Sequence, residues 1–198
     1  MISTYKIKPA FQKLLTPLLK VLRKLGVTPN LLTVKAILLS LFLGYLFYEA
    51  ESNNTYYLYV ALGLLFRMML NALDGMMARV YDLQSRTGEV LNEVGDIVSD
   101  VAIFYPLLFL EGLDFRLAFS FIVLSVINEF CGILGKAMGG ERRYDGPMGK
   151  SDRATVVGVI CLLFYFDIGV EPYLKYIFAI AVVLVSLSSV IRLKHSIK

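Results

Sequence analysis

Long apolar stretches separated by short polar turns dominate the chain from residue 31 to its end. These runs lie at Leu31–Tyr48, Tyr56–Leu70, Val101–Leu110, Leu117–Ile127, Val156–Phe166 and Tyr176–Ile191. With its more polar flanks, each run makes a segment of about 20 residues, the length with which an α-helix crosses roughly 30 Å of hydrocarbon. The pattern therefore predicts an all-α integral membrane protein whose residues 28–198 form a domain of six transmembrane helices.

Residues 1–27 follow a different pattern, which is typical of an amphipathic helix lying in the membrane interface. Its apolar positions recur at helical spacing and are Phe11, Leu14, Leu15, Leu18 and Leu22. Lysines fall on the other side, so we interpret the segment as an anchor that is attracted to anionic lipid. A role in gating access of the substrate is the alternative. Thr28 is expected to cap the first transmembrane helix, with Pro29 in its first turn.

Composition and charge agree with a membrane protein and suggest its orientation. The chain is 57% hydrophobic and 18% charged, whereas a soluble domain carries about 25% charged residues. Basic residues precede the first apolar run and recur in the connection 139–152 and in the C-terminal tail, while Glu49, Glu51, Asp114 and Glu171 lie in alternate turns. By the positive-inside rule, both ends of the chain are expected in the cytosol.

Polar residues interrupt the second and third predicted helices at bilayer depth, where an ionisable group costs about 2.5–3.5 kcal/mol. They are Arg67, Asn71, Asp74 and Arg79, followed by Glu89, Asn92, Glu93, Asp96 and Asp100. Asn71 and Asp74 share one helical face, and Asn92 and Asp96 share another. A short turn joins the two helices, so we expect antiparallel neighbours whose polar faces meet. Carboxylate and amide oxygens are ligands for hard cations such as Mg²⁺ or Mn²⁺.

Structural ion pairing is the alternative explanation for these charges. Arg67 and Glu129 are interpreted in this way, as a pair between helices. The second and third helices together hold five acidic residues against two basic ones, and like charges one helical turn apart repel. We therefore favour a site for a metal or another cationic ligand in these two helices.

Residues 71–96 also resemble a known signature. The run from Asn71 to Arg79 reads N-A-L-D-G-M-M-A-R, and eight residues later the run from Gly88 to Asp96 reads G-E-V-L-N-E-V-G-D. This resembles D-x-x-D-G-x-x-A-R, about eight residues, then G-x-x-x-D-x-x-x-D, the signature of the CDP-alcohol phosphotransferase (CDP-alcohol phosphatidyltransferase) family. The spacing agrees throughout, but Asn71 and Asn92 replace the first and third acids of the signature.

The resemblance implies transfer of a phosphatidyl or similar group from a CDP-linked lipid, such as CDP-diacylglycerol, to an acceptor alcohol, with release of CMP. It implies that Asp96 is the catalytic base. One or two Mg²⁺ or Mn²⁺ ions would be held by Asn71, Asp74, Asn92 and Asp96, with Glu93 compensating for a missing acid. The nucleotide would be bound by Asp74, Gly75, Ala78, Arg79 and Gly88.

The glycine-rich connection 139–153 resembles the segment that lines the acceptor pocket in relatives acting on phosphorylated alcohols. Arg143, Lys150 and Arg153 are the candidates for binding a phosphate there. The alternative is that these cations only anchor the loop on the cytosolic side of the membrane.

The predicted partners follow from this interpretation: a CDP-linked lipid, an acceptor alcohol, membrane lipids and, by the resemblance, a second copy in a homodimer, with no nucleic acid. We expect a location in a bacterial inner membrane. Serine, glycerol phosphate, inositol phosphate or another polar alcohol could be the acceptor. The alternative functions are a catalytically altered relative that binds a nucleotide-lipid, a cation transporter and a purely structural membrane protein.

Overall fold

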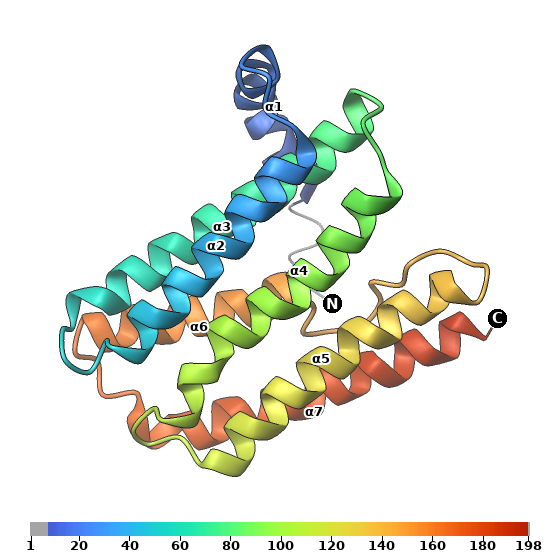
Figure 1. The fold of residues 1–198 in the computed structure, drawn as a ribbon. Helices are drawn as coiled ribbons and strands as arrows, with labels where there is room; N and C mark the ends of the chain where they lie inside the picture. Colours follow the sequence, from blue (N-terminus) through green and yellow to red (C-terminus); the bar gives the residue numbers. More distant parts are fainter. Residues whose placement is uncertain (1–7, 198) are drawn as a thin grey trace.

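The computed structural model describes residues 8–197 and is helical throughout, apart from short turns and one longer loop (Figure 1). The helices are α1 (Lys8–Lys24), α2 (Pro29–Tyr48), α3 (Thr55–Val80), α4 (Arg86–Phe104), α5 (Phe115–Ala137), α6 (Lys150–Tyr165) and α7 (Glu171–Ser196). A short 3₁₀ helix, η2 (Tyr105–Leu108), extends α4. The predicted all-α fold is therefore confirmed, although residues 1–7 of the predicted interfacial segment lie outside the described residues.

Four helices within residues 8–197 are long and apolar enough to cross a bilayer, namely α2, α3, α5 and α7. Helix α6 has 16 residues and α4 has 19, and α4 also contains the acidic residues singled out above. Large apolar side chains such as Phe42, Leu65 and Ile180 are at least half exposed on the outer surface of the bundle. Such a surface is suited to lipid rather than to water.

Helix α2 packs along both α3 and α4. A Cβ atom on Gly44 would lie 2.3 Å from the carbonyl oxygen of Ala102, so α2 and α4 approach backbone to backbone at this point. The helices α3 and α4 diverge from their shared turn, and each packs mainly on α2 rather than along the other (Figure 1). Their polar faces nevertheless meet as expected, since Arg67 of α3 donates to Asp100 of α4 at 2.7 Å.

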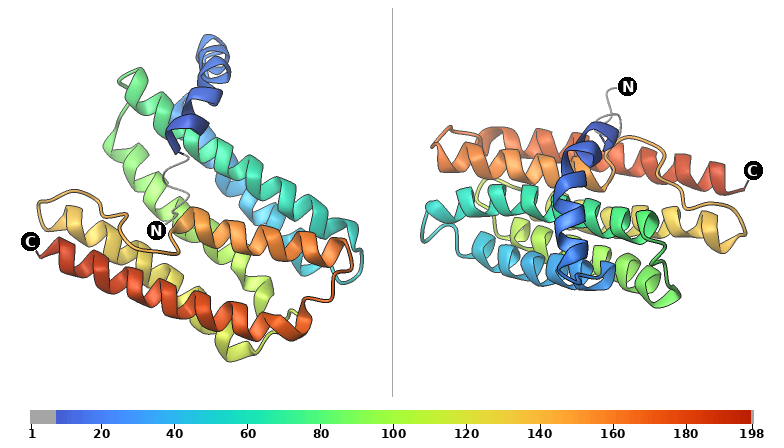
Figure 2. Two further views of the ribbon diagram at one scale, coloured as in Figure 1. Left: turned by 180° about the vertical axis from the view of Figure 1, so that it is seen from behind. Right: turned by 90° about the horizontal axis from the view of Figure 1, so that it is seen from above.

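The second half of the bundle is built on α5 and α7, which lie side by side, while α6 packs against α3 (Figures 1 and 2). Three buried aromatic rings join this half to α4: Phe121 lies 5.1 Å from Phe104 and 5.2 Å from Phe178 between ring centroids. These contacts and the apolar residues around them form the larger of two hydrophobic cores. The polar residues of α3 and α4 that the sequence singled out lie towards the other end of the bundle from this core.

Helix α1 runs across the direction of the other helices (Figure 2). Leu15 and Leu19 are buried in the smaller core, which also includes Leu73 and Met77 of α3. Leu14 is exposed, so the predicted apolar face is divided between the protein and its surroundings. Pro17 lies inside the helix without ending it. This division suits a helix that rests on the bundle and also faces the membrane interface.

The start of α2 and the end of α4 are each explained by residues in the local sequence. The Thr28 hydroxyl accepts a hydrogen bond from the Leu31 amide, with Pro29 at the first helical position, which confirms the predicted cap of α2. Helix α4 ends at Phe104, within the predicted apolar run Val101–Leu110. The chain continues as η2, because Pro106 has no amide hydrogen to donate to an α-helical turn.

Candidate active site

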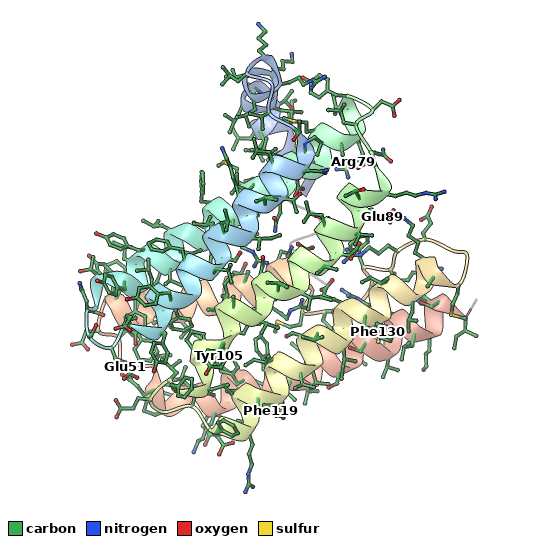
Figure 3. All side chains as sticks on the ribbon, viewed as in Figure 1. Glu51, Arg79, Glu89, Tyr105, Phe119 and Phe130 are labelled. Carbon is green, nitrogen blue, oxygen red and sulfur yellow. The ribbon has the colours of Figure 1, made fainter. Side chains whose placement is uncertain are left out.

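The two halves of the signature lie around the turn that joins α3 to α4. Residues 71–79 form the last turns of α3, and residues 88–96 form the first turns of α4. Figure 3 shows Arg79 and Glu89 close to this turn, with Glu51 at the opposite end of the bundle. The candidate site therefore lies towards the end of the helix bundle that carries the turn between α3 and α4.

Asp74 is buried on α3 and is oriented by α2. Its Oδ2 atom accepts a hydrogen bond from the Thr33 hydroxyl at 3.0 Å, and the same hydroxyl lies 3.2 Å from the Pro29 carbonyl oxygen, which competes for its one proton. The carboxylate lies within electrostatic range of both Asp96 and Lys150. The sequence analysis missed Thr33, although its position one helical turn after Pro29 places it on the inner face of α2.

Asp96 on α4 is buried and forms an ion pair with Lys150, the first residue of α6. Side chains from three helices thus converge, since Asp74 comes from α3, Asp96 from α4 and Lys150 from α6. The lysine had been predicted to bind the phosphate of an acceptor, and the structure instead shows it engaged with the candidate base. This contact was not foreseen because 53 residues separate the two side chains along the chain.

The side chains at this site offer the oxygen atoms that a hard divalent cation prefers, but few of them carry a negative charge. Among residues 8–197, no group of three or more His, Cys, Asp or Glu side chains is placed to hold a metal ion. The two signature carboxylates, Asp74 and Asp96, are accompanied by the half-buried amides Asn71 and Asn92. Two carboxylates and two amide oxygens suit one Mg²⁺ or Mn²⁺ ion, because both ions prefer oxygen ligands.

A buried network of charges lies next to these residues. Asp100 accepts from Arg67 at 2.7 Å and from Arg153 at 3.0 Å, and Arg153 also donates to Glu129 at 2.7 Å. The predicted pair between Arg67 and Glu129 is wrong: Arg67 on α3 faces α4, whereas Glu129 on α5 faces α6. Arg153 has no exposed surface, so its predicted role in binding a phosphate would require it to leave both acids.

The network continues into the loop before α6. Arg142 pairs with Glu129 at 2.9 Å and with Glu93 at 2.8 Å, and its guanidinium also lies over the Tyr144 ring. Burial opposes the charge on Arg142, yet Tyr144, Glu129 and Glu93 together raise its pKa above the usual value. Glu93, the predicted compensating ligand, therefore has a cation as its partner. Its role as a metal ligand stays a prediction.

Arg192 and Asn128 are polar residues whose position the sequence analysis did not anticipate. Arg192 had been grouped with the basic tail, but it is buried in α7 and donates to the Asn128 carbonyl at 2.8 Å and to the Asp145 carbonyl at 3.2 Å. Asn128 in turn accepts from Arg153 at 3.2 Å. A signal was present, since Arg192 continues the helical face of the buried residues Val185 and Ser188.

The residues predicted to bind the nucleotide lie near the turn between α3 and α4, but their surroundings differ from one residue to the next. Arg79 is exposed, and its guanidinium lies back over Gly75, where an added Cβ would be 3.2 Å from Nη1. A Cβ on Gly88 would lie 2.6 Å from Oδ1 of Asn30, so Gly88 admits a side chain of α2. Ala78 is half-buried on the same turns of α3.

Comparison with known proteins identifies the lineage of this arrangement. The sequence profile described as CDP-alcohol phosphatidyltransferase matches residues 26–188. The chain belongs to this family. Inner membrane protein YnbA of Escherichia coli K12 is 43% identical over 157 residues, which cover 79% of this chain and 78% of YnbA. Archaetidylinositol phosphate synthase of Pyrococcus horikoshii is 26% identical over 165 residues, covering 83% of this chain and 85% of the synthase.

Solved structures of Mycobacterium tuberculosis phosphatidylinositol phosphate synthase (PgsA1) share the CDP-alcohol phosphatidyltransferase fold with this chain. The complex with manganese and citrate matches with a TM-score of 0.75 and 23% identity, covering 91% of this chain and 87% of PgsA1. The structure with CDP-DAG bound matches with a TM-score of 0.74 and 23% identity, covering 93% and 94%. At this identity the likeness establishes the fold alone.

Within this family fold, Thr33 has a testable role as the residue that orients Asp74. We expect Thr33→Val to weaken Mn²⁺ binding by about 10-fold, because loss of a hydrogen bond to a metal ligand typically costs 10- to 100-fold in affinity. Calorimetric titration of the purified protein with Mn²⁺ measures the change. Thr55→Val in the first turn of α3, where the side chain is half-buried and distant from the signature, serves as the control and should leave the affinity unchanged.

Proposed function

We propose that this chain is a phosphotransferase that moves a phosphatidyl or similar substituted phosphate group from a CDP-linked lipid to an acceptor alcohol and releases CMP. One observation carries the proposal: the two acids retained from the family signature, Asp74 and Asp96, are buried near one another at one end of the bundle. Membership of the CDP-alcohol phosphatidyltransferase family supports the same reaction class. The CDP-DAG bound by PgsA1 supports CDP-diacylglycerol as the donor.

The proposed arrangement in the membrane follows from the charges. Helices α2 to α7 cross the bilayer, α1 lies in the interface, and both ends are cytosolic, with the signature turn on the same side. This orientation places Arg142, Arg143 and Lys150 in a cytosolic loop, as the positive-inside rule requires. The likeness to YnbA, an inner membrane protein, supports an inner membrane location. The family resemblance supports a homodimer.

The chemistry requires a base for the acceptor hydroxyl and charge stabilisation on the pyrophosphate. Asp96 takes the hydroxyl proton while the acceptor oxygen bonds to the lipid-side phosphorus, and the bond from that phosphorus to the CMP oxygen breaks. A bound divalent cation, supported by the manganese in PgsA1, would lower the charge on the phosphates. The cation would be held by Asn71, Asp74, Asn92 and Asp96. Glu93 is the remaining candidate ligand.

Arg79 is placed to serve the nucleotide side of this reaction. Its guanidinium is exposed at the signature turn, so it can swing from Gly75 to the pyrophosphate of an arriving donor. Gly75 and Ala78 are small residues and leave room for the donor beside Arg79. Gly88 lets the start of α4 approach α2. An arginine can form paired hydrogen bonds with a phosphate, which a lysine at this position could not match.

The loop 139–149 would receive the acceptor. Arg143 is half-buried and donates to the His195 carbonyl at 2.8 Å. Of the three predicted phosphate-binding residues, it is the one with no carboxylate partner among residues 8–197. Lys150 and Arg153 are already paired with carboxylates. A phosphorylated acceptor would have to replace these acids at the cations, whereas an uncharged alcohol would not.

The proposed function is tested by supplying the purified protein with CDP-diacylglycerol, Mg²⁺ or Mn²⁺ and a panel of acceptors, and by measuring CMP. The panel contains serine, glycerol phosphate, inositol phosphate and uncharged polyols. We expect CMP release that depends on one acceptor class, with formation of the corresponding phospholipid. CDP-diacylglycerol binding without CMP release for any acceptor would contradict the proposal.

That contradicting outcome corresponds to the second candidate function, a relative that binds a nucleotide-lipid without efficient transfer. Asn71 and Asn92 favour it, because each removes a carboxylate from the signature. The third candidate, a cation transporter, rests on the intramembrane acids alone. It is separated from the others by uptake of labelled Mn²⁺ into proteoliposomes, which neither a transferase nor a silent binder should show.

A further inference from the structure

We propose that the site binds a single divalent cation and that the Lys150 ammonium group supplies the second positive charge beside Asp96. The inference rests on the proposed function only in taking the signature residues as the metal ligands. It assigns Lys150 a place in the metal centre, whereas the sequence analysis had placed this residue in an acceptor pocket.

The signature positions of this chain carry fewer negative charges than the family pattern. Four carboxylates in the family pattern balance two divalent cations, whereas this chain retains only Asp74 and Asp96. The Asn71 and Asn92 carbonyls can ligate a cation but contribute no charge. Two Mn²⁺ ions at this position would leave two positive charges uncompensated in a buried setting, where such charges are costly.

Neighbouring acids do not compensate for the two missing carboxylates. Each acid that could restore the missing charges already has a cationic partner: Glu93 pairs with Arg142, Glu89 with Lys136, and Asp100 with both Arg67 and Arg153. The three arginines that hold Glu93 and Asp100 are largely or fully buried. Recruiting Glu93 or Asp100 to a metal ion would therefore leave a buried guanidinium without its acid.

Lys150 lies beside both signature carboxylates. It begins α6, and its ammonium group pairs with Asp96 and lies within electrostatic range of Asp74. Its side chain is about a quarter exposed, at 23%, so solvent screens it only in part. A cation so placed repels a second metal ion at close range. With one divalent ion and Lys150, three positive charges face two carboxylates, and the anionic pyrophosphate of a donor would offset the excess.

The experiment is a count of bound Mn²⁺ per chain. The full chain in lipid nanodiscs is equilibrated with Mn²⁺ by dialysis, and low-temperature electron paramagnetic resonance distinguishes isolated ions from coupled pairs. We expect one Mn²⁺ per chain at saturation, with the six-line signal of an isolated ion. Two ions per chain, or none, would overturn the proposal.

Lys150 variants test the assignment of the second charge. We expect Lys150→Gln to raise Mn²⁺ affinity by about tenfold, because a nearby positive charge is removed from a weakly screened site. Lys150→Arg retains the charge and should stay within about twofold of wild type on the same electrostatic argument. Equal Mn²⁺ affinity in Lys150→Gln and wild type would show that Lys150 is not part of the metal centre.

Restoring the acids of the family signature should allow a second Mn²⁺ ion to bind. The triple variant Asn71→Asp/Asn92→Asp/Lys150→Gln supplies four carboxylates and no lysine, and we expect two coupled Mn²⁺ ions per chain. Size-exclusion retention in detergent reports whether this variant is folded, and the wild-type count stands without it. CMP release from the same preparations reports separately on the proposed function, so one bound ion without turnover supports this inference while refuting the transferase.

Discussion

Replacing Asp96 with asparagine is expected to lower acceptor-dependent CMP release by about 10³-fold or more. The change removes the group proposed to take the acceptor proton, and general-base catalysis typically contributes 10²- to 10⁴-fold. It also removes one of only two signature carboxylates, so loss of charge stabilisation adds to the effect. The initial rate of CMP release at saturating donor and acceptor measures it.

The matched control for this variant is Asp167→Asn, the same chemical change at the opposite end of the bundle. Asp167 is exposed in the turn after α6 and has a φ of 54°, a left-handed conformation that asparagine adopts readily. Its CMP release should equal that of wild type. Retention of more than a tenth of the wild-type rate by Asp96→Asn would show that another group is the base.

Replacing Asp100 with asparagine is expected to lower the free energy of unfolding by about 3–5 kcal/mol, the usual cost of removing one member of a buried ion network. Asp100 accepts from Arg67 and Arg153, and all three side chains are almost completely buried. Its loss leaves two guanidiniums facing one another without the acid between them. Denaturant titration in mixed micelles, followed by circular dichroism, measures the loss.

Asp145→Asn is the control for this second variant. Asp145 pairs with His195 at 3.4 Å, but both side chains are more than a third exposed. Exposed pairs contribute roughly 0–1 kcal/mol, so the free energy of unfolding should change little. If Asp100→Asn were as mild as Asp145→Asn, Arg67 and Arg153 would have to find other acceptors inside the bundle.

The apolar pattern was sufficient to predict most of the fold, because membrane helices must be long, apolar and internally hydrogen-bonded. The cap at Thr28 and the amphipathic helix α1 could also be predicted from the local sequence, while the position of α1 in the membrane interface stays a prediction. The short turn 81–85 predicted that α3 and α4 follow one another, but not that α2 packs along both. That arrangement depends on Gly44, where the absence of a side chain lets two backbones meet.

The proximity of the two signature acids could be predicted from the sequence, but the ion pairs around them could not. Helical spacing and the short turn predicted that the faces carrying Asp74 and Asp96 meet, and both side chains are buried within electrostatic range of one another. The partners of Asp96 and Glu93 lie about 50 residues away, on α6 and in the loop before it. Because the side-chain period of one helix carries no information about which distant helix packs against it, these ion pairs became visible only in the structure.

The contact of α2 with both α3 and α4 has a consequence for how a ligand could open the site. Gly44 and Ala102 meet without an intervening side chain, so α2 and α4 resist sliding past one another and should tilt as one body. Helix α2 also packs closely on α3, where a Cβ atom on Gly63 would lie 2.3 Å from the Leu43 side chain, and Thr33 adds a hydrogen bond to Asp74. A lipid donor that enters between Asp74 and Asp96 would therefore find these three helices fixed relative to one another. The space it needs would have to come from the connections 81–85 and 139–149.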